Sequence, residues 1–353
     1  MKIGIMTFHW APNYGAVLQT YSLVNYLKKE MNAQVKVIDY YPKNLEPSFY
    51  NALKARDPRR IAGNLRDLKK EKKIKAFRRE LPLTQRYYTN QQLKSKKLEF
   101  DYILAGSDQI WNPSFLMYGE KKPTPSYYLD FADESVKRLS VSASFGCENL
   151  PDECIDIAEP LLKKFVGISV RENTGKDILS SMGIEHVSVT ADPTSLISKE
   201  DLMALCTEKP VVKPVSVSKF ILRKQTKENE ALINSICEEF SKTTIKDIDC
   251  LSIGQWLSAI RDSEFVVTNS FHCVMMCLKL HTPFAIILEN GKRAGMNDRF
   301  FTLMKEFDLT ERIVNDSTDI KNLKKHIDFS CVDKKMEEYS KSLRAFLEKN
   351  IKQ

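Results

Sequence analysis

Short apolar runs typical of strands alternate with helical patterns along most of the chain, and this alternation limits the fold more than any other feature. The run Lys2–Thr7 is followed by apolar residues at helical spacing over positions 17–27, and the next apolar run is Val35–Asp39. Parallel strands require crossover connections, which helices supply. The alternation therefore predicts an α/β fold built from parallel sheets with right-handed crossovers.

The strand and helix signals fall into two sets. The first set ends with the run Val187–Thr190, the second begins near Val215, and Pro, Lys and Glu accumulate between them. Two sets in 353 residues predict two doubly wound Rossmann-type domains that face each other across a cleft. The expected divisions are an N-terminal domain over 1–195, a C-terminal domain over 196–330 and an amphipathic helix over 331–353 that packs back.

Composition narrows the class of protein further. Apolar residues make up 42% of the chain, enough for full cores, yet no run approaches the roughly 20 apolar residues of a membrane span. The first residues, Met1–Met6, resemble a first strand rather than a signal peptide. The eight cysteines are scattered without a CxxC pair. This pattern predicts reduced thiols, a cytoplasmic location, and neither a zinc site nor any other metal centre.

Positive charge is concentrated in one segment. Between Lys54 and Arg79 there are twelve Lys or Arg residues against three Asp or Glu residues, within a basic helical excursion expected over about 50–95. One interpretation is a solvated helical face. The other is a surface for an anionic partner such as a lipid head group at the inner face of a membrane. Nucleic acid is not expected, because no aromatic platform or recognition motif accompanies the charge.

The segment Val266–His272 carries the most chemical information. It is a buried strand that ends in a polar turn, and His272 follows at the start of the next helix. Ligands of open α/β sheets bind at the carboxyl ends of strands, where a helix N-terminus offers N–H groups to an anion. A histidine there can donate, accept or carry a proton near neutral pH. This arrangement is typical of a transferase that uses a phosphorylated donor.

Other polar clusters also follow predicted strands. Gly106–Asn112 is the densest, and in it Ser107 and Asp108 either cap the following turn or contact a ligand. Trp111 is either a core anchor or a flat face for a sugar ring. Arg171 ends a strand, where it either pairs with an acidic residue on the rim or holds a carboxylate or phosphate in two bonds. His9 follows the first strand and is a second candidate for the cleft.

Taken together, these segments make the chain resemble the polysaccharide pyruvyl transferases. The matching segments occur in the order of that family: Asn13–Gln19, Gly106–Asn112, Ser142–Gly146, Ser169–Glu172, Ala191–Thr194, Thr268–His272 and Asn297–Phe300. The resemblance implies a GT-B-like fold, phosphoenolpyruvate as co-substrate without a further cofactor, and a sugar of a surface polysaccharide or its lipid-linked precursor as acceptor. It also links an arginine after a strand and a histidine in the second half to catalysis, and these match Arg171 and His272.

One departure from the family concerns the donor. Many members carry an arginine two residues before the histidine, where this chain has Ser270, so the charge must come from Arg299, Arg293 or Lys219. The expected donor-binding residues are Asn269, Ser270, Phe271, Arg299 and Lys219. Arg293 is only a possible source of charge. The expected acceptor-binding residues come from the first half of the chain: His9, Asn13, Tyr14, Gly15, Gln19, Ser107, Gln109, Trp111 and Asn112.

The mechanism expected from this resemblance protonates the enol carbon of the donor, adds one sugar hydroxyl at C2, and lets a second hydroxyl displace phosphate to leave a cyclic ketal. His272 is the expected general acid, Arg171 the anion clamp, and Asp108 or His9 the base for the hydroxyl proton. Two alternatives remain open on the same fold. One is a glycosyltransferase that uses a nucleotide sugar, and the other is a non-catalytic protein that binds a sugar or phosphate.

Overall fold

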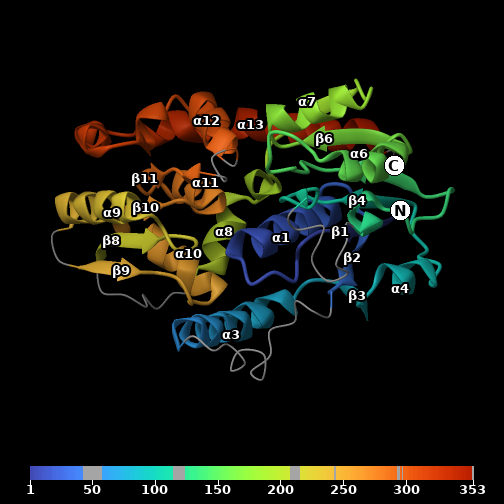
Figure 1. Ribbon diagram of the computed structural model, residues 1–353, viewed down its shortest axis with the longest axis horizontal. Coiled ribbons are helices and arrows are strands. Elements are labelled where there is room, and N and C mark those ends of the chain that lie inside the picture. The colour runs from blue at the N-terminus through green and yellow to red at the C-terminus, as the bar shows by residue number, and fades with distance from the viewer. Residues whose placement is uncertain are drawn as a thin grey trace. The chain divides into compact units, whose positions relative to one another are not determined.

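The computed structural model describes residues 1–42, 58–113, 124–206, 215–241, 244–291, 295 and 297–351. The chain divides into two compact units, Met1–Ile197 with Tyr339–Gln353 and Ser198–Glu338. Each unit contains one parallel sheet with helices (Figure 1).

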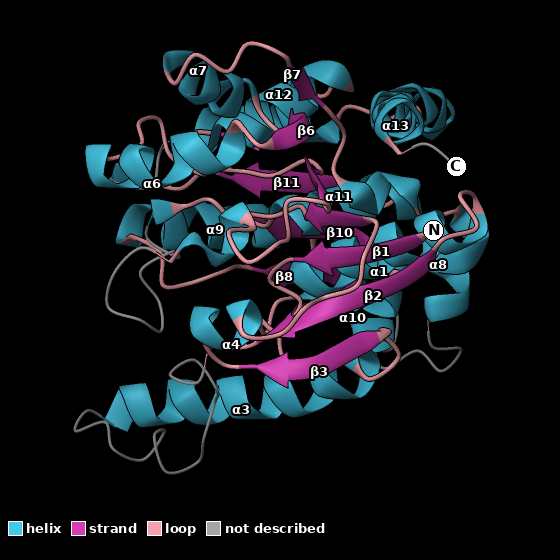
Figure 2. Cartoon of the chain, turned by 90° about the vertical axis from the view of Figure 1, so that its right-hand side faces the viewer, coloured by secondary structure: helices cyan, strands magenta, loops and turns pink. Residues whose placement is uncertain are grey.

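The first unit is built on a seven-stranded parallel sheet in the order β3-β2-β1-β4-β5-β6-β7. Its first six strands follow the order of a dinucleotide-binding Rossmann sheet. Figure 2 shows β1, β2 and β3 side by side, with their arrows pointing the same way. The strands are β1 Lys2–Met6, β2 Gln34–Tyr40, β3 Leu83–Tyr87, β4 Tyr102–Ala105, β5 Lys137–Ser140, β6 Phe165–Val170 and β7 Val187–Val189.

Helices connect these strands, and apolar residues of the sheet are buried in two clusters. Helix α1 begins where the Asn13 side chain accepts a hydrogen bond from the Gly15 N–H, and it ends at Lys28 and Lys29, whose charges suit a helix C-terminus. The helices are α1 Tyr14–Lys29, α3 Pro58–Arg78, α4 Asn90–Lys94, η2 Pro125–Tyr128, α6 Asp152–Leu162, α7 Asn173–Ser181 and η3 Pro193–Leu196.

The second unit contains a five-stranded parallel sheet in the order β12-β11-β10-β8-β9. When these five strands are numbered 1 to 5 along the chain and read from β9 to β12, their order is 2-1-3-4-5, as in a doubly wound sheet. The strand order reverses between β8 and β10. Apolar residues of β8, β10 and β11 pack against α9. The strands are β8 Val215–Phe220, β9 Ile245–Asp247, β10 Ser263–Thr268, β11 Phe284–Ile287 and β12 Ile313–Val314.

Polar caps fix where the helices of the second unit begin. Ser252 and Gln255 form a reciprocal capping box at the start of α10, and Thr226 caps α9. The helices are α8 Lys199–Leu205, α9 Lys227–Phe240, α10 Ile253–Arg261, α11 Phe271–Leu280, α12 Asp298–Glu306, η5 Thr310–Arg312 and η6 Ser317–Lys324.

The last helix, α13 (Phe329–Asn350), packs back onto the first sheet. Its residues Leu343, Phe346 and Leu347 are buried in the same cluster as Ile3 and Leu104 of the first sheet. The first part of α13 groups with the second unit, and the part from Tyr339 onward groups with the first. Among the described residues, no helix is long and apolar enough to cross a membrane.

The basic excursion differs from the helical segment expected over 50–95. Its described part, from Pro58, contains α3 and α4, but β3 lies between them and pairs with β2. Lys70 of α3 is buried, with its ammonium 4.6 Å from the centre of the Tyr14 ring. This cation–π contact shields Lys70 from solvent and removes it from the set of exposed charges.

Candidate active site

The carboxyl edge of the first sheet is formed by the residues that follow β1, β4, β5, β6 and β7. Arg171 leaves the end of β6, where its guanidinium Nη1 lies 2.9 Å from Asp192 Oδ2, and both side chains are almost fully buried. Burial disfavours the charged guanidinium, but the carboxylates of Asp192, Glu172 and Asp108 outweigh this effect and raise the pKa of Arg171 above its usual range. Arg171 therefore forms the rim ion pair that was the alternative to an anion clamp.

Carboxylates outnumber cations around Arg171. Glu172 is buried and accepts a hydrogen bond of 2.5 Å from Ser144 Oγ, while its Oε2 lies 3.6 Å from Arg171 Nε. With Asp108 and Asp192, three carboxylates surround one guanidinium. An excess of carboxylates repels anions and favours groups that donate hydrogen bonds, such as sugar hydroxyls.

Asp108 has a left-handed backbone, as does Ser142 after β5 at the same edge. The φ of Asp108 is +78°, a left-handed conformation that a residue other than glycine adopts only at a cost of about 1–3 kcal/mol. Its side chain is partly exposed and accepts a hydrogen bond from the Gln109 N–H at 2.9 Å. The strained turn keeps a carboxylate accessible at the end of β4, as a base for a bound hydroxyl requires.

The thiol of Cys147 lies near the same carboxylates. Burial, reinforced by Glu172 and Cys154, raises the pKa of Cys147 to about 11. The thiol is therefore protonated near neutral pH and is a poor nucleophile. Covalent chemistry through Cys147 is not favoured.

His9 is held in a buried charge network rather than presented to a ligand. Its Nε2 lies 3.0 Å from Asp39 Oδ1 and its Nδ1 3.1 Å from the Thr7 carbonyl oxygen. Both ring nitrogens thus face hydrogen-bond acceptors within the protein. Asp39 also accepts from Arg86 Nε at 2.9 Å. This environment gives His9 a structural role and argues against its use as base or acceptor contact.

Several other expected acceptor residues join neighbouring elements below the surface. Gln19 Nε2 donates to Thr7 Oγ1 at 2.9 Å, and Thr7 Oγ1 donates to the Ser107 carbonyl oxygen at 2.9 Å. Ser107 Oγ in turn donates to Asp192 Oδ2 at 3.1 Å. Tyr14 and Gly15, in the first turn of α1, are also buried. Of the acceptor residues near α1, Asn13 alone is partly exposed, and its side chain caps the helix.

Trp111 is a core anchor. It is fully buried, stacks on Tyr128 at 5.8 Å between ring centres, and donates from Nε1 to the Tyr127 carbonyl oxygen at 3.1 Å. A ring in this position cannot offer a face to a sugar. The sugar-stacking interpretation of Trp111 is therefore not supported.

Gln109 and Asn112 pack on Gly146, whose φ is +59°. A Cβ atom on Gly146 would lie 2.7 Å from Gln109 Nε2 and 2.8 Å from Asn112 Nδ2. Asn112 Nδ2 also donates to the Gly146 carbonyl oxygen at 3.2 Å. The expected polar loop is thus locked against the end of β5, with both amides buried.

The carboxyl edge of the second sheet has a different character. Asn269 follows β10 and joins the end of β8 through two hydrogen bonds, accepting from the Leu222 N–H at 2.7 Å and donating to the Leu222 carbonyl oxygen at 3.0 Å. Its Nδ2 also lies 3.0 Å from Glu289 Oε1 beyond β11. Asn269 therefore fixes the loops at the point where the strand order reverses.

Ser270 caps helix α11 by accepting from the Cys273 N–H at 3.4 Å. Its hydroxyl is therefore used to start the helix, which explains a serine at this position in structural terms. His272 lies in the first turn of α11, is 5% exposed, and meets the Phe271 ring edge-on at 5.5 Å. No acidic residue lies in the first turn of α11, which leaves the helix N-terminus attractive to an anion.

The cations expected to replace an arginine at position 270 are placed unequally. Arg299 lies 5.9 Å from the Phe271 ring centre and 5.3 Å from that of Phe300. Lys219 lies within β8, opposite Asp247 of β9 in the strand register. Its charge partly offsets the burial that raises the pKa of the Cys237 thiol of α9. Arg293 lies outside the described residues. The structure thus brings Arg299 beside the Phe271 side chain but leaves Lys219 inside the sheet.

Arg223 was not identified from the sequence. It follows β8 by three residues, is partly exposed, and lies 3.5 Å from Glu289 Oε1 through Nη1. The signal that could have found it is the one used for Arg171, an arginine directly after an apolar run, here Val217–Leu222.

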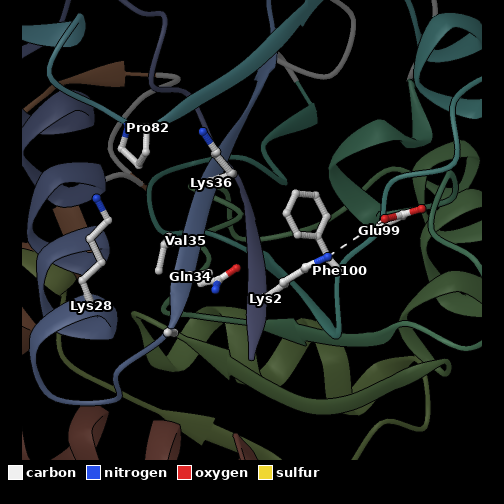
Figure 3. A pocket seen from close by; sticks show the side chains of 9 residues that line it. Lys2, Lys28, Gln34, Val35, Lys36, Pro82, Glu99 and Phe100 are labelled. Atoms are coloured by element: carbon white, nitrogen blue, oxygen red, sulfur yellow. Dashed lines mark ion pairs between the residues drawn. The ribbon is translucent and has the colours of Figure 1, made fainter.

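A hollow lies at the start of the first sheet, at the opposite end of its strands from the carboxyl edge of that sheet. It has a volume of about 540 Å³ and is found where β1 and β2 begin (Figure 3). Lys2 points toward Glu99 there, at 4.0 Å. Because ligands of such sheets bind at the opposite, carboxyl ends of strands, this hollow is not part of the site. It is lined by Lys2, Lys28, Ala33, Gln34, Val35, Lys36, Pro82, Glu99 and Phe100.

Metal ligands are also absent from both edges as far as the structure describes them. In the described ranges, no group of three or more His, Cys, Asp or Glu side chains is arranged to hold a metal ion.

The two parallel sheets and their strand orders define the chain as a protein of two Rossmann-type domains, the GT-B class of fold. A solved structure of UDP-N-acetylglucosamine 2-epimerase from Rickettsia bellii has this fold, with a TM-score of 0.56 at 8% identity over 98% of this chain and 95% of that chain. Arabidopsis thaliana UGT89C1 complexed with UDP-L-rhamnose matches with a TM-score of 0.48 at 12% identity over 99% and 97% of the two chains. No curated protein matches the sequence.

The sequence itself gives the family. The model of the polysaccharide pyruvyl transferases matches residues 13–290, which include most of both carboxyl edges, and the chain belongs to that family. It is by family a transferase with a saccharide acceptor.

Proposed function

We propose that the protein transfers a pyruvyl group from phosphoenolpyruvate to a saccharide and forms a cyclic ketal. The observation that carries this proposal is the contrast between the two carboxyl edges of a chain in this family. The first edge holds an accessible carboxylate, Asp108, among other acids, and the second holds an acid-free helix N-terminus beside a histidine. Hydroxyls suit the first environment and an anionic donor the second.

In the proposed reaction, a proton is added to the enol carbon of the donor and a sugar hydroxyl forms a bond to C2. Asp108 accepts the proton that this hydroxyl releases. A second hydroxyl then bonds to C2 as the bond between C2 and the phosphate oxygen breaks, and its proton leaves with the phosphate. The products are the ketal and inorganic phosphate, so no other reactant is needed.

His272 is the proposed general acid of this reaction. General acid catalysis contributes about 100-fold or more to a rate, so His272→Ala should lower turnover by at least about 100-fold. His272→Gln is the matched variant, because it keeps a polar side chain but cannot shuttle a proton in the same way. Near-normal turnover of a folded His272→Ala protein would remove His272 from the mechanism.

The function is tested by incubating the protein with phosphoenolpyruvate and candidate saccharides. The expected result is phosphate release that requires the saccharide, with a product that carries one ketal-linked pyruvate by mass spectrometry. Transfer of a hexose from a nucleotide sugar would identify the glycosyltransferase alternative. Binding of phosphoenolpyruvate without phosphate release across the saccharides would favour a non-catalytic binding protein.

A further inference from the structure

The second sheet reverses its strand order between β8 and β10, and Arg223 lies at that point. Its position follows from the chain path, because β8 ends at Phe220 and the Leu222 backbone is held by Asn269. Arg223 itself has a φ of +65°, so the chain turns sharply after Leu222. In doubly wound sheets, the reversal point is where ligands bind.

We infer that Arg223 is a donor-binding residue that contacts an oxyanion of phosphoenolpyruvate, with Glu289 as its positioning residue. The inference rests on the proposed function for the identity of the donor. An arginine fork binds carboxylate or phosphate oxygens through paired N–H groups, which serine cannot do. Arg223 would therefore provide the charge that Ser270 lacks.

Three features distinguish Arg223 from the other cations considered for this role. Its side chain is 36% exposed, whereas Lys219 lies within a strand of the sheet. Arg299 has its guanidinium near two aromatic rings. Arg223 is also placed at the end of a strand, at the same edge as the N-terminus of α11.

Glu289 lies near the Arg223 guanidinium but does not form a close ion pair with it. The separation of 3.5 Å between Arg223 Nη1 and Glu289 Oε1 is longer than a charge-assisted hydrogen bond. Glu289 is itself fixed, because Asn269 donates to its carboxylate and Asn297 exchanges two hydrogen bonds with its backbone. The carboxylate orients Arg223 and can give way to a stronger anion.

Of the helices α9 and α11, which both begin at this edge, only α11 has an N-terminus that favours an anion. The first turn of α9 contains Glu228 and Glu230, which repel anions. The first turn of α11 contains no acidic residue. An oxyanion between Arg223 and the start of α11 would therefore meet a guanidinium and free partial positive charge together.

The test measures the KM for phosphoenolpyruvate and for the saccharide separately. Loss of one charged hydrogen-bond partner typically weakens binding by about tenfold to a hundredfold, so Arg223→Ala should raise the KM for phosphoenolpyruvate by that factor and leave the saccharide KM within about twofold. Arg223→Lys should recover part of the loss. The neighbouring Lys224→Ala, which is also exposed, is the matched control and should change neither value.

Glu289→Gln provides a readout that damage to the fold does not produce. Its amide oxygen can still accept hydrogen bonds from Asn269 and from Arg223, so Arg223 stays oriented, but the charge that competes with the donor is removed and the KM for phosphoenolpyruvate should fall. An unchanged KM in Arg223→Ala would overturn the role of Arg223. A raised KM in Glu289→Gln would overturn the competition between Glu289 and the donor.

Inorganic phosphate separates this inference from the proposed function. If the wild-type protein releases no phosphate from phosphoenolpyruvate with any saccharide, the proposed function fails. A thermal shift by inorganic phosphate that disappears in Arg223→Ala, but not in Lys224→Ala, would still support the anion site. Turnover of phosphoenolpyruvate with equal KM in the wild type and Arg223→Ala would sink the inference while leaving the function intact.

Discussion

Arg171 follows β6 at the place where an anion clamp was expected, yet its partners are internal carboxylates. Its partner Asp192 lies 21 residues away in the sequence, and the 2.9 Å contact between Arg171 Nη1 and Asp192 Oδ2 is buried. A buried ion pair contributes little net stability by itself, but removal of one partner leaves an isolated charge. The role of this residue is thus set by the neighbours that the fold brings to it.

Arg171→Ala should therefore destabilise the protein by about 3–5 kcal/mol, because Asp192 would remain buried without its cation. Urea denaturation measures the change. Arg171→Ala combined with Asp192→Asn should cost less than the sum of the single changes. A single variant that unfolds within about 1 kcal/mol of the wild type would contradict this interpretation.

Asp39 makes the stability of the protein depend on acid. Burial opposes its ionisation, but the hydrogen bonds and charges of His9 and Arg86 outweigh burial and lower the pKa of Asp39. A carboxylate with a lowered pKa in the folded state stabilises the protein above its unfolded pKa of about 4. This contribution is lost as the pH falls through the folded value.

The free energy of unfolding should thus decrease as the pH falls below about 4, and Asp39→Asn should show a shallower decrease. Denaturation midpoints between neutral and acidic pH provide the measurement. Glu185→Gln, which changes an exposed carboxylate, is the control. Equal pH profiles for the wild type and Asp39→Asn would show that the network of His9 and Asp39 does not contribute.

At the scale of elements, local patterns predicted the long helices and central strands well. The apolar spacing over positions 17–27 predicted a helix, and α1 spans Tyr14–Lys29. The apolar runs Lys2–Thr7 and Val35–Asp39 likewise match β1 and β2. By contrast, β3, β9 and β12 were not predicted, since these strands at or near the edges of the sheets lack a long apolar run. Their place depends on pairing with a neighbouring strand.

Helix α13 is an element whose contribution can be measured directly. Leu347 is fully buried against the first sheet, so Leu347→Ala should cost about 2–5 kcal/mol of stability. Glu348→Ala, on the exposed side of the same helix, should remain within about 0.5 kcal/mol. Thermal or urea unfolding of the two variants compares them. Equal stabilities would show that α13 does not complete the core of the first unit.

At the scale of the whole molecule, the positive charge outside the site is the feature that can attract an anionic partner. The formal net charge is +8, and α3 carries much of it. Its residues Lys69, Lys72 and Lys73 are exposed, whereas Lys70 is buried over Tyr14. Exposed lysines attract anionic lipid surfaces by roughly 1 kcal/mol each near the surface.

Charge reversal of Lys69, Lys72 and Lys73 to Glu should therefore weaken binding to vesicles that contain anionic lipid. Co-sedimentation at low and moderate salt measures this binding, and salt should weaken it further. Vesicles of neutral lipid are the control for nonspecific adsorption. Binding that is unaffected by charge reversal would leave α3 as a solvated face.

The sequence by itself determined the α/β class, the two sets of strands and helices, and the family, because these depend on apolar periodicity and on motifs that are continuous in the chain. It also located the strand ends where chemistry is expected. Only the tertiary structure decided which of those polar residues are buried or paired within the protein. The Asp39 carboxylate contacts His9, which lies 30 residues away in the sequence. Trp111 is buried against the Tyr128 ring from another segment. Burial and ion pairing arise from such distant neighbours, which no local pattern contains.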